Sequence, residues 1–118
     1  SSGAAHQCLN GWLTYCMSKA ALLQVMRGLD QELAPQVRVG SMMPGVVDTP
    51  MQEKIRNMKF DAVDYFRSLS AGVATTWEEA QAPPEHSLDR PENVADFLTW
   101  LLTEVKAEEF GGREWDIN

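Results

Sequence analysis

Two proline positions set the strongest limits on how this chain can fold. Pro35 ends any helix that precedes it, because proline lacks an N–H group and its ring clashes with the previous turn. Pro44 and Gly45 form a second turn signal further along the chain. The apolar run between the two prolines, Val37 to Met43, has the length and composition of a strand. The sequence therefore predicts a helix, then a strand, then a tight turn.

The segment before Pro35 is predicted to be helical from about Thr14 to Leu33. Its apolar residues recur at intervals that place them on one side of a helix, and they are Leu22, Val25, Met26, Leu29 and Leu33. The small and apolar residues of this helix, among them Ala20, Ala21 and Gly28, pack either in the core of the chain or against a partner, and the sequence does not separate the two.

The rest of the chain also mixes helical and extended segments. Residues from Pro50 to about Leu69 are helix-prone, and Gly72 to Arg90 forms the least regular stretch. A last helix is predicted to begin at Pro91, since proline is favoured at the first helical position. The turn at Gly111-Gly112 then leads into a final strand, Arg113 to Ile117. These elements are typical of an α/β domain.

Tyr15 and Lys19 form the most chemically suggestive pair. They stand four residues apart, so the phenol and the ammonium group project from one face of the predicted helix. A free tyrosine hydroxyl has a pKa of roughly 10, and a neighbouring cation lowers it. Tyr15 could then donate a proton to a substrate oxygen or accept one in reverse, while the Ser2 hydroxyl holds the same oxygen. The alternative is that the pair is only the solvated side of an amphipathic helix.

Three stretches together carry a family resemblance. Ser1-Ser2-Gly3, the run YCMSKAAL from Tyr15 to Leu22, and the run PGVVDTPMQEKIR from Pro44 to Arg56 resemble the C-terminal half of a short-chain dehydrogenase/reductase. The last run resembles the branch that contains sepiapterin reductase and benzil reductase. The resemblance implies one partial domain over residues 1–118, the C-terminal half of a Rossmann-like doubly wound parallel sheet with two of its strands.

The resemblance also implies an activity, the reduction of a ketone or diketone with NADP in its reduced form, NADPH, as cofactor, and NAD not excluded. The hydride must come from the cofactor, because no side chain can supply one. Tyr15 would be the acid/base, Ser2 would polarise the carbonyl, and Lys19 would hold the nicotinamide ribose and lower the tyrosine pKa. The implied cofactor-binding residues are Tyr15, Lys19, Pro44, Gly45, the backbone near Val47, and Thr49.

Three residues are predicted to contact the substrate, and each has a simpler alternative. His6 either reaches the substrate or lies in a loop at the rim of the site. Met51 either faces the substrate from a lid or packs within its helix. Asp116 occupies a position where related reductases carry an acidic residue that can bind a substrate amino group, or it is a surface carboxylate. Trp12 either shields the pocket or packs beneath the helix.

Half of the expected cofactor site is missing from the sequence. A doubly wound fold binds pyrophosphate at a glycine-rich turn after its first strand. The 8 glycines of this chain never form G-x-x-x-G-x-G after a predicted strand, and the family's catalytic asparagine has no matching position. We therefore expect either a fragment of a reductase or a truncated, non-catalytic relative that acts as an interaction or dimerisation subunit.

Composition narrows the classes of partner. A net charge of −7, from 10 basic and 17 acidic residues, argues against nucleic acid and anionic membranes. No apolar run is long enough to span a membrane and no signal peptide is evident, which predicts a cytoplasmic protein. The cysteines and histidines lack ligand spacing, so no metal site is predicted. The resemblance implies a small-molecule carbonyl substrate and a homodimer formed through the Tyr15–Leu33 helix.

Overall fold

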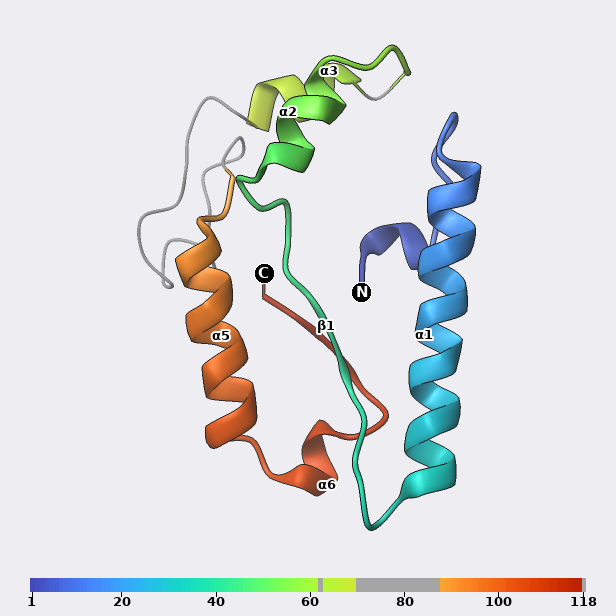
Figure 1. Ribbon diagram of the computed structural model, residues 1–118, viewed down its shortest axis with the longest axis vertical. Helices are drawn as coiled ribbons and strands as arrows, with labels where there is room; N and C mark the ends of the chain where they lie inside the picture. Colours follow the sequence, from blue (N-terminus) through green and yellow to red (C-terminus); the bar gives the residue numbers. More distant parts are fainter. Residues whose placement is uncertain (62, 70–87, 118) are drawn as a thin grey trace.

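The computed structural model describes residues 1–61, 63–69 and 88–117 (Figure 1). Its elements, in chain order, are η1 (Gly3–Ala5), α1 (Leu13–Leu33), β1 (Ser41–Met43), α2 (Pro50–Arg56), α3 (Val63–Ser68), α5 (Pro91–Thr103), α6 (Ala107–Phe110) and β2 (Glu114–Asp116). Most of the irregular stretch predicted from Gly72 to Arg90 lies outside the described residues. Within the described part, no helix is long and apolar enough to cross a bilayer.

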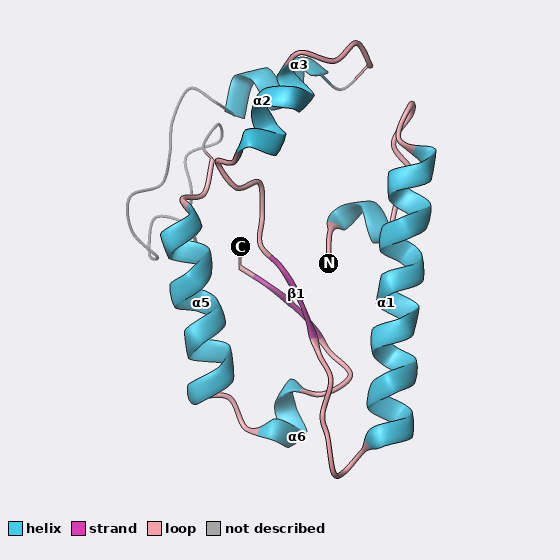
Figure 2. Ribbon diagram, viewed as in Figure 1, coloured by secondary structure: helices cyan, strands magenta, loops and turns pink. Residues whose placement is uncertain are grey.

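The two predicted strands form a parallel pair, as expected. Met42 of β1 lies opposite Trp115 of β2, and the Ile117 N–H donates to the Met43 carbonyl at 3.2 Å. In the view of Figure 2 the strands run between α5 and α1. Two neighbouring parallel strands need a crossover connection. Here the chain between β1 and β2, which includes α2, α3, α5 and α6, supplies it.

Both strands are shorter than predicted. The strand expected over Val37–Met43 is restricted to Ser41–Met43, and the one expected over Arg113–Ile117 to Glu114–Asp116. The reason is visible at Val39, whose N–H donates to the Asp30 side chain at 2.8 Å and whose carbonyl accepts from Gly112 at 2.9 Å. Backbone groups before Ser41 therefore bond to a side chain and to a turn instead of extending the ladder.

The core lies between α5 and the sheet. Phe97 and Leu101 of α5 are buried together with Ile117, which follows β2. Residues packed around them are Met42, Val94, Val105, Phe110 and Trp115. Because side chains alternate along a strand, Trp115 and Ile117 face this core while Glu114 and Asp116 face the opposite side.

The long helix α1 agrees with the predicted Thr14–Leu33 to within one residue and ends before Pro35. Its buried residues are Cys16, Leu23, Met26 and Asp30. Of the predicted apolar stripe, only Met26 is buried; Leu22, Val25, Leu29 and Leu33 are 42–55% exposed. Four of the five members of the stripe are therefore not packed in the core of this chain, and their contact with a partner stays a prediction.

Asp30 fastens the end of α1 to the sheet. Its carboxylate accepts hydrogen bonds from Arg38 Nε at 2.8 Å and from Arg38 Nη2 at 2.9 Å, in addition to the Val39 N–H. The chain also passes close by at Gly112, which has a φ of +70° and where a Cβ would lie 3.0 Å from Asp30 Oδ2. A Cβ at Gly111 would lie 2.3 Å from the Arg38 guanidinium. The Gly111-Gly112 turn thus lets β2 approach this ion pair.

The stretch from Pro50 to about Leu69, predicted to be helix-prone, forms two separate helices, α2 and α3. The break occurs at Asn57, whose side-chain amide donates to the Glu53 carbonyl at 3.0 Å. Asparagine side chains compete in this way with the backbone bonds of a continuing helix. α3 restarts after a turn in which the Val63 N–H donates to the Phe60 carbonyl at 3.1 Å.

Asp30→Asn tests the fastening of α1. Hydrogen bonds from Arg38 and from the Val39 N–H hold the pKa of Asp30 at about 2, below its ordinary 3.8. A depressed carboxyl pKa stabilises the fold above the unfolded-state pKa, and this contribution is lost as pH falls through the folded-state value. Urea unfolding should therefore show wild type more stable than Asp30→Asn at pH 7, with the difference shrinking as the pH falls from 3.8 toward 2.

The matched control is Asp64→Asn. Asp64 pairs with Arg67 at 3.0 Å on the surface, where its side chain is 88% exposed. Such pairs contribute little, so the free energy of unfolding should change by less than about 0.5 kcal/mol. A difference between wild type and Asp30→Asn that stays constant across the acidic range would contradict the assignment.

Candidate active site

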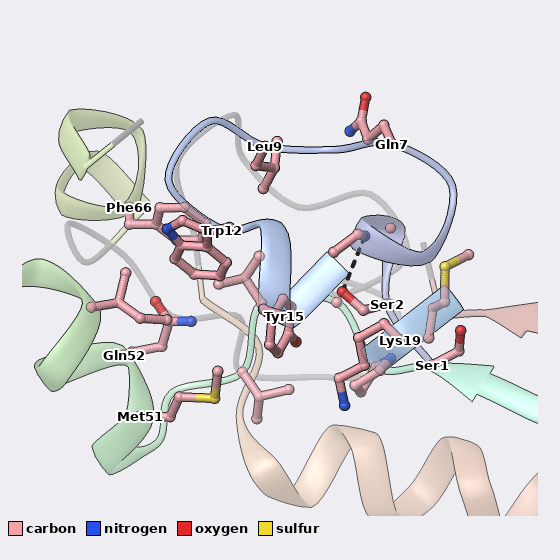
Figure 3. A pocket seen from close by; sticks show the side chains of 18 of the residues that line it. Ser1, Ser2, Gln7, Leu9, Trp12, Tyr15, Lys19, Met51, Gln52 and Phe66 are labelled. Carbon is pink, nitrogen blue, oxygen red and sulfur yellow. Dashed lines mark hydrogen bonds between the residues drawn. The ribbon is translucent and has the colours of Figure 1, made fainter. Parts of the chain in front are cut away.

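Three stretches of the chain supply most of the lining of one open cavity of about 690 Å³, and α3 and β2 add Tyr65, Phe66 and Asp116 (Figure 3). The first is the N-terminal segment with η1, the second is the start of α1, and the third runs from the end of β1 into α2. Ser2, Tyr15, Lys19, Pro44 and Thr49 all line it. The structure thus brings together residues that the sequence places far apart.

Tyr15 and Lys19 lie one helical turn apart on α1 and both are half-buried at the cavity. The Lys19 Nζ atom lies 5.3 Å from the centre of the Tyr15 ring, within the range of a cation–π contact. The predicted shared face of the pair is therefore confirmed. Their roles in proton transfer and cofactor binding stay predictions.

Ser2 stands at the start of η1, on the same side of the pocket as Tyr15 and Lys19 in Figure 3. Its Oγ accepts a hydrogen bond from the Ala4 N–H at 3.3 Å. The hydroxyl hydrogen of a serine that acts only as an acceptor stays available for a second oxygen. The Ser1 nitrogen donates to the Met42 carbonyl at 2.6 Å, which holds this segment beside β1.

Glu114 of β2 does not line the cavity but bonds to two residues that do, Ser1 and His6, and the sequence reasoning missed it. One carboxylate oxygen accepts a hydrogen bond from the Ser1 hydroxyl, and the other bonds to His6 Nε2. Burial by itself would raise the pKa of Glu114, but the hydrogen bonds from Ser1 and His6 outweigh it and hold that pKa below its ordinary value. Strand alternation with Asp116 was the signal that could have placed Glu114 on the pocket side.

One ring nitrogen of His6, Nε2, is therefore already hydrogen-bonded to Glu114. Its side chain is 46% exposed and it lines the cavity. This position fits the rim loop that was one of its two alternatives. Contact between His6 and a substrate stays a prediction.

The turn after β1 presents backbone groups to the cavity. Gly45 has a φ of 72°, a conformation that favours glycine. Beyond it, the Asp89 N–H donates to the Val46 carbonyl at 3.0 Å, and the Asp48 N–H donates to the Asp89 carbonyl at 2.8 Å. In such a parallel bridge the N–H and carbonyl of the central residue, Val47, point away from the partner. Val47 itself lines the cavity.

Aromatic side chains line the cavity on the side that lies away from Ser2 and Lys19 (Figure 3). The Trp12 ring meets the Tyr15 ring edge-on at 5.3 Å and stacks on Phe66 of α3 at 5.4 Å. The centre of the Phe60 ring lies 5.1 Å from the centre of the Trp12 ring. Trp12 lines the cavity and stacks on α3, and shielding of the pocket by Trp12 stays a prediction. Such ring pairs join α3 to the start of α1.

Two further predicted contacts lie at the cavity. Met51 lines it and is 48% exposed. Asp116 also lines it and is exposed; burial, together with the Asp116 charge, raises the pKa of the neighbouring Asp89. Substrate binding by Met51 and Asp116 stays a prediction. Among the described residues, no cluster of three His, Cys, Asp or Glu side chains is arranged to hold a metal ion.

Comparison with known proteins gives the family. A family model described as short chain dehydrogenase matches residues 1–59, which include Ser2, Tyr15, Lys19 and the turn at Pro44. The chain belongs to the short-chain dehydrogenase family. This confirms the fold class predicted from the sequence, which is part of a Rossmann-like α/β fold.

Individual relatives agree with this assignment. The chain is 41% identical over 123 residues to a benzil reductase, (S)-benzoin forming, of Bacillus subtilis, which covers 99% of this chain and 44% of the relative. It is 35% identical over 109 residues to an uncharacterized oxidoreductase of Schizosaccharomyces pombe, covering 85% of this chain and 44% of that protein. The crystal structure of the KRED1-Pglu enzyme matches with a TM-score of 0.70 and 32% identity, covering 97% of this chain and 44% of the other. The chain thus spans less than half the length of these proteins.

Proposed function

We propose that this chain supplies the proton-transfer part of an NAD(P)H-dependent carbonyl reductase. The observation that carries the proposal is the meeting of Ser2, Tyr15 and Lys19 at one cavity with the turn from Pro44 to Thr49. When hydride adds to a carbonyl carbon, a proton donor, a second hydroxyl and a nearby cation can together bind, protonate and stabilise its oxygen.

The residues at the cavity fit the nicotinamide end of a dinucleotide. Lys19 offers an ammonium group for ribose hydroxyls, and the backbone of Val47 and the hydroxyl of Thr49 offer polar groups for a carboxamide. When bound, a reduced nicotinamide supplies the hydride. The sequence contains no glycine-rich turn for the pyrophosphate, so we propose that this part of the site lies outside these 118 residues. NADP is the proposed cofactor, with NAD not excluded.

Two hydroxyl groups of this chain then act on the carbonyl oxygen of the substrate. Ser2 donates a hydrogen bond to it, and Tyr15 donates the proton that converts it into a hydroxyl. The proton leaves a phenolate behind, which the Lys19 charge stabilises from one helical turn away.

The aromatic wall supports an aryl ketone or diketone as substrate. The flat faces of Trp12 and Phe66 offer large apolar surfaces of the kind that aromatic groups pack against. Three curated relatives are named benzil reductases, and benzil is an aryl diketone.

Tyr15→Phe tests the proposal. Removal of one hydroxyl eliminates the proton donor, so kcat for NADPH-dependent reduction of benzil by the full-length protein should fall at least about a hundredfold. Lys19→Met should also impair reduction, whereas the matched change of an exposed lysine, Lys59→Met, should leave the rate within about twofold. Diketone reduction that survives in Tyr15→Phe would refute the mechanism.

A second function, assembly, is favoured by the exposed apolar residues of α1. We propose that the face formed by Leu22, Val25, Leu29 and Leu33 contacts a second copy of the chain in a homodimer. Interfaces of this kind are formed by apolar patches that a single chain leaves exposed. A non-catalytic interaction subunit would keep this face without using the cavity.

Leu22→Glu tests the dimer by sedimentation equilibrium. Wild type should sediment as a dimer, and a buried charge at the interface should shift Leu22→Glu to a folded monomer. The control Leu102→Glu changes a 67% exposed leucine of α5 and should stay dimeric. A monomeric wild type, or a Leu22→Glu variant that stays dimeric, would show that this face does not form the proposed dimer.

A further inference from the structure

Two cysteines stand on either side of the loop that leads into α1. Cys8 is exposed in the segment before the loop, whereas Cys16 lies near the start of α1 and is only 6% exposed. Cys16 directly follows Tyr15 in the sequence. Neither thiol takes part in the proposed proton transfer, so any chemistry of this pair is separate from it.

The loop folds back so that both sulfur atoms lie at Leu9, the residue after Cys8. The Leu9 N–H donates to Cys16 Sγ at 3.4 Å, and the Cys8 thiol donates to the Leu9 carbonyl at 3.9 Å. The Trp12 N–H donates to the same carbonyl at 2.9 Å and closes the turn, in which Gly11 has a φ of +80°. Contacts with one stretch of backbone thus hold the two thiols in the same place.

The titration of Cys8 indicates the same proximity. Desolvation, followed by the charge and hydrogen bond of the neighbouring Cys16 thiol, raises the pKa of Cys8 above its ordinary value. A thiol with a raised pKa is mostly protonated near neutral pH, and the thiolate is the form that reacts. Reaction of this pair therefore depends on the position of the second thiol and not on an activated Cys8.

We propose that Cys8 and Cys16 form a redox modification site, at which a small-molecule disulfide such as glutathione disulfide converts the two thiols into a reversible internal disulfide. The new bond joins the segment before the loop to α1. Between the two cysteines lies Trp12, whose ring meets the Tyr15 ring edge-on at 5.3 Å. In Figure 3 this loop runs past Leu9 to Trp12 at the edge of the pocket. Oxidation should therefore restrain the position of Trp12 at the cavity.

The conversion is a thiol–disulfide exchange in two steps. The thiolate of the exposed Cys8 attacks one sulfur of glutathione disulfide, which forms a mixed disulfide and releases one glutathione thiolate. The Cys16 thiolate then attacks the Cys8 sulfur and releases the second glutathione. The two protein sulfur atoms are oxidised, one glutathione disulfide is reduced to two glutathione molecules, and these take up the two protons of the protein thiols.

The test equilibrates the full-length protein in glutathione buffers of graded composition, alkylates the remaining thiols and maps the peptides by mass spectrometry. No Lys or Arg lies between Cys8 and Cys16, so both fall in one tryptic peptide that ends at Lys19. In oxidising buffers this peptide should lose two hydrogens in mass and escape alkylation. Chymotryptic cleavage after Trp12 should then leave two pieces that separate only on reduction.

The position of the equilibrium tests whether the fold holds the thiols together. Half of the folded protein should be oxidised at a ratio of squared glutathione concentration to glutathione disulfide concentration at least about tenfold higher than in concentrated urea. An equal or lower ratio for the folded protein would overturn the inference. So would a wild type that stops at the mixed disulfide with glutathione, or that links Cys8 to a cysteine elsewhere in the full-length protein.

The matched control is Cys8→Ser/Gln7→Cys, which moves the outer thiol by one residue within an exposed stretch. The folded control should need a glutathione buffer at least about tenfold more oxidising than wild type, because its new thiol no longer directly precedes Leu9. Cys8→Ser alone leaves the buried Cys16 without a partner thiol and should stay unmodified. A control that is oxidised as readily as wild type would overturn the inference.

Hydrogen exchange tests the restraint of Trp12. The backbone amides of residues 9–12 should exchange at least about threefold more slowly in oxidised than in reduced wild type, because the disulfide limits local opening of the loop. Peptides from α5 should exchange equally in both forms. Equal exchange of the loop amides in the two forms would show that the disulfide does not restrain Trp12.

Discussion

The ion pair between Asp30 and Arg38 is the interaction on which the arrangement of the site depends. It joins the last turns of α1 to the segment before β1 and receives the Gly112 turn that precedes β2. Because α1 is one continuous helix, fixing its end at Asp30 also fixes Tyr15, roughly 22 Å further back along the axis. The position of the Tyr15 phenol relative to the end of β1 therefore follows from a contact at the other end of the helix.

The two walls of the cavity have different chemistry. Hydroxyl and ammonium groups from the N-terminal segment and α1 form the polar side, and the Trp12 ring with α3 forms the apolar side. Two buried atoms of this region, Trp12 Nε1 and Gln52 Oε1, have no hydrogen-bond partner among the described residues. A buried donor and a buried acceptor without partners cost free energy unless a ligand or a rearrangement of the neighbouring helices supplies their hydrogen bonds.

Much of this arrangement could be predicted from the sequence, because it depends on local signals. Pro35 ends α1, the Pro44-Gly45 turn ends β1, and the spacing of Tyr15 and Lys19 places them on one face. The break at Asn57 was missed because one side-chain bond to the backbone decides it. The contacts of Glu114 with Ser1 and His6, and the burial of Gln52 at the cavity, were missed because they depend on neighbours that are distant in sequence. Strand lengths were overestimated for the same reason, since side-chain and turn contacts replace the ladder.

We propose that in this cavity a carbonyl carbon receives hydride and its oxygen receives a proton. The most direct measurement uses NADPH deuterated at the transferable position of its nicotinamide ring, the full-length protein and benzil, with the product analysed early by mass spectrometry. If hydride is transferred to the carbonyl carbon with Tyr15 as proton donor, the wild type should form benzoin that carries the deuterium at its carbinol carbon. The Tyr15→Phe variant should form no labelled benzoin over the same time. Unlabelled benzoin, or equal labelled product from Tyr15→Phe, would contradict it.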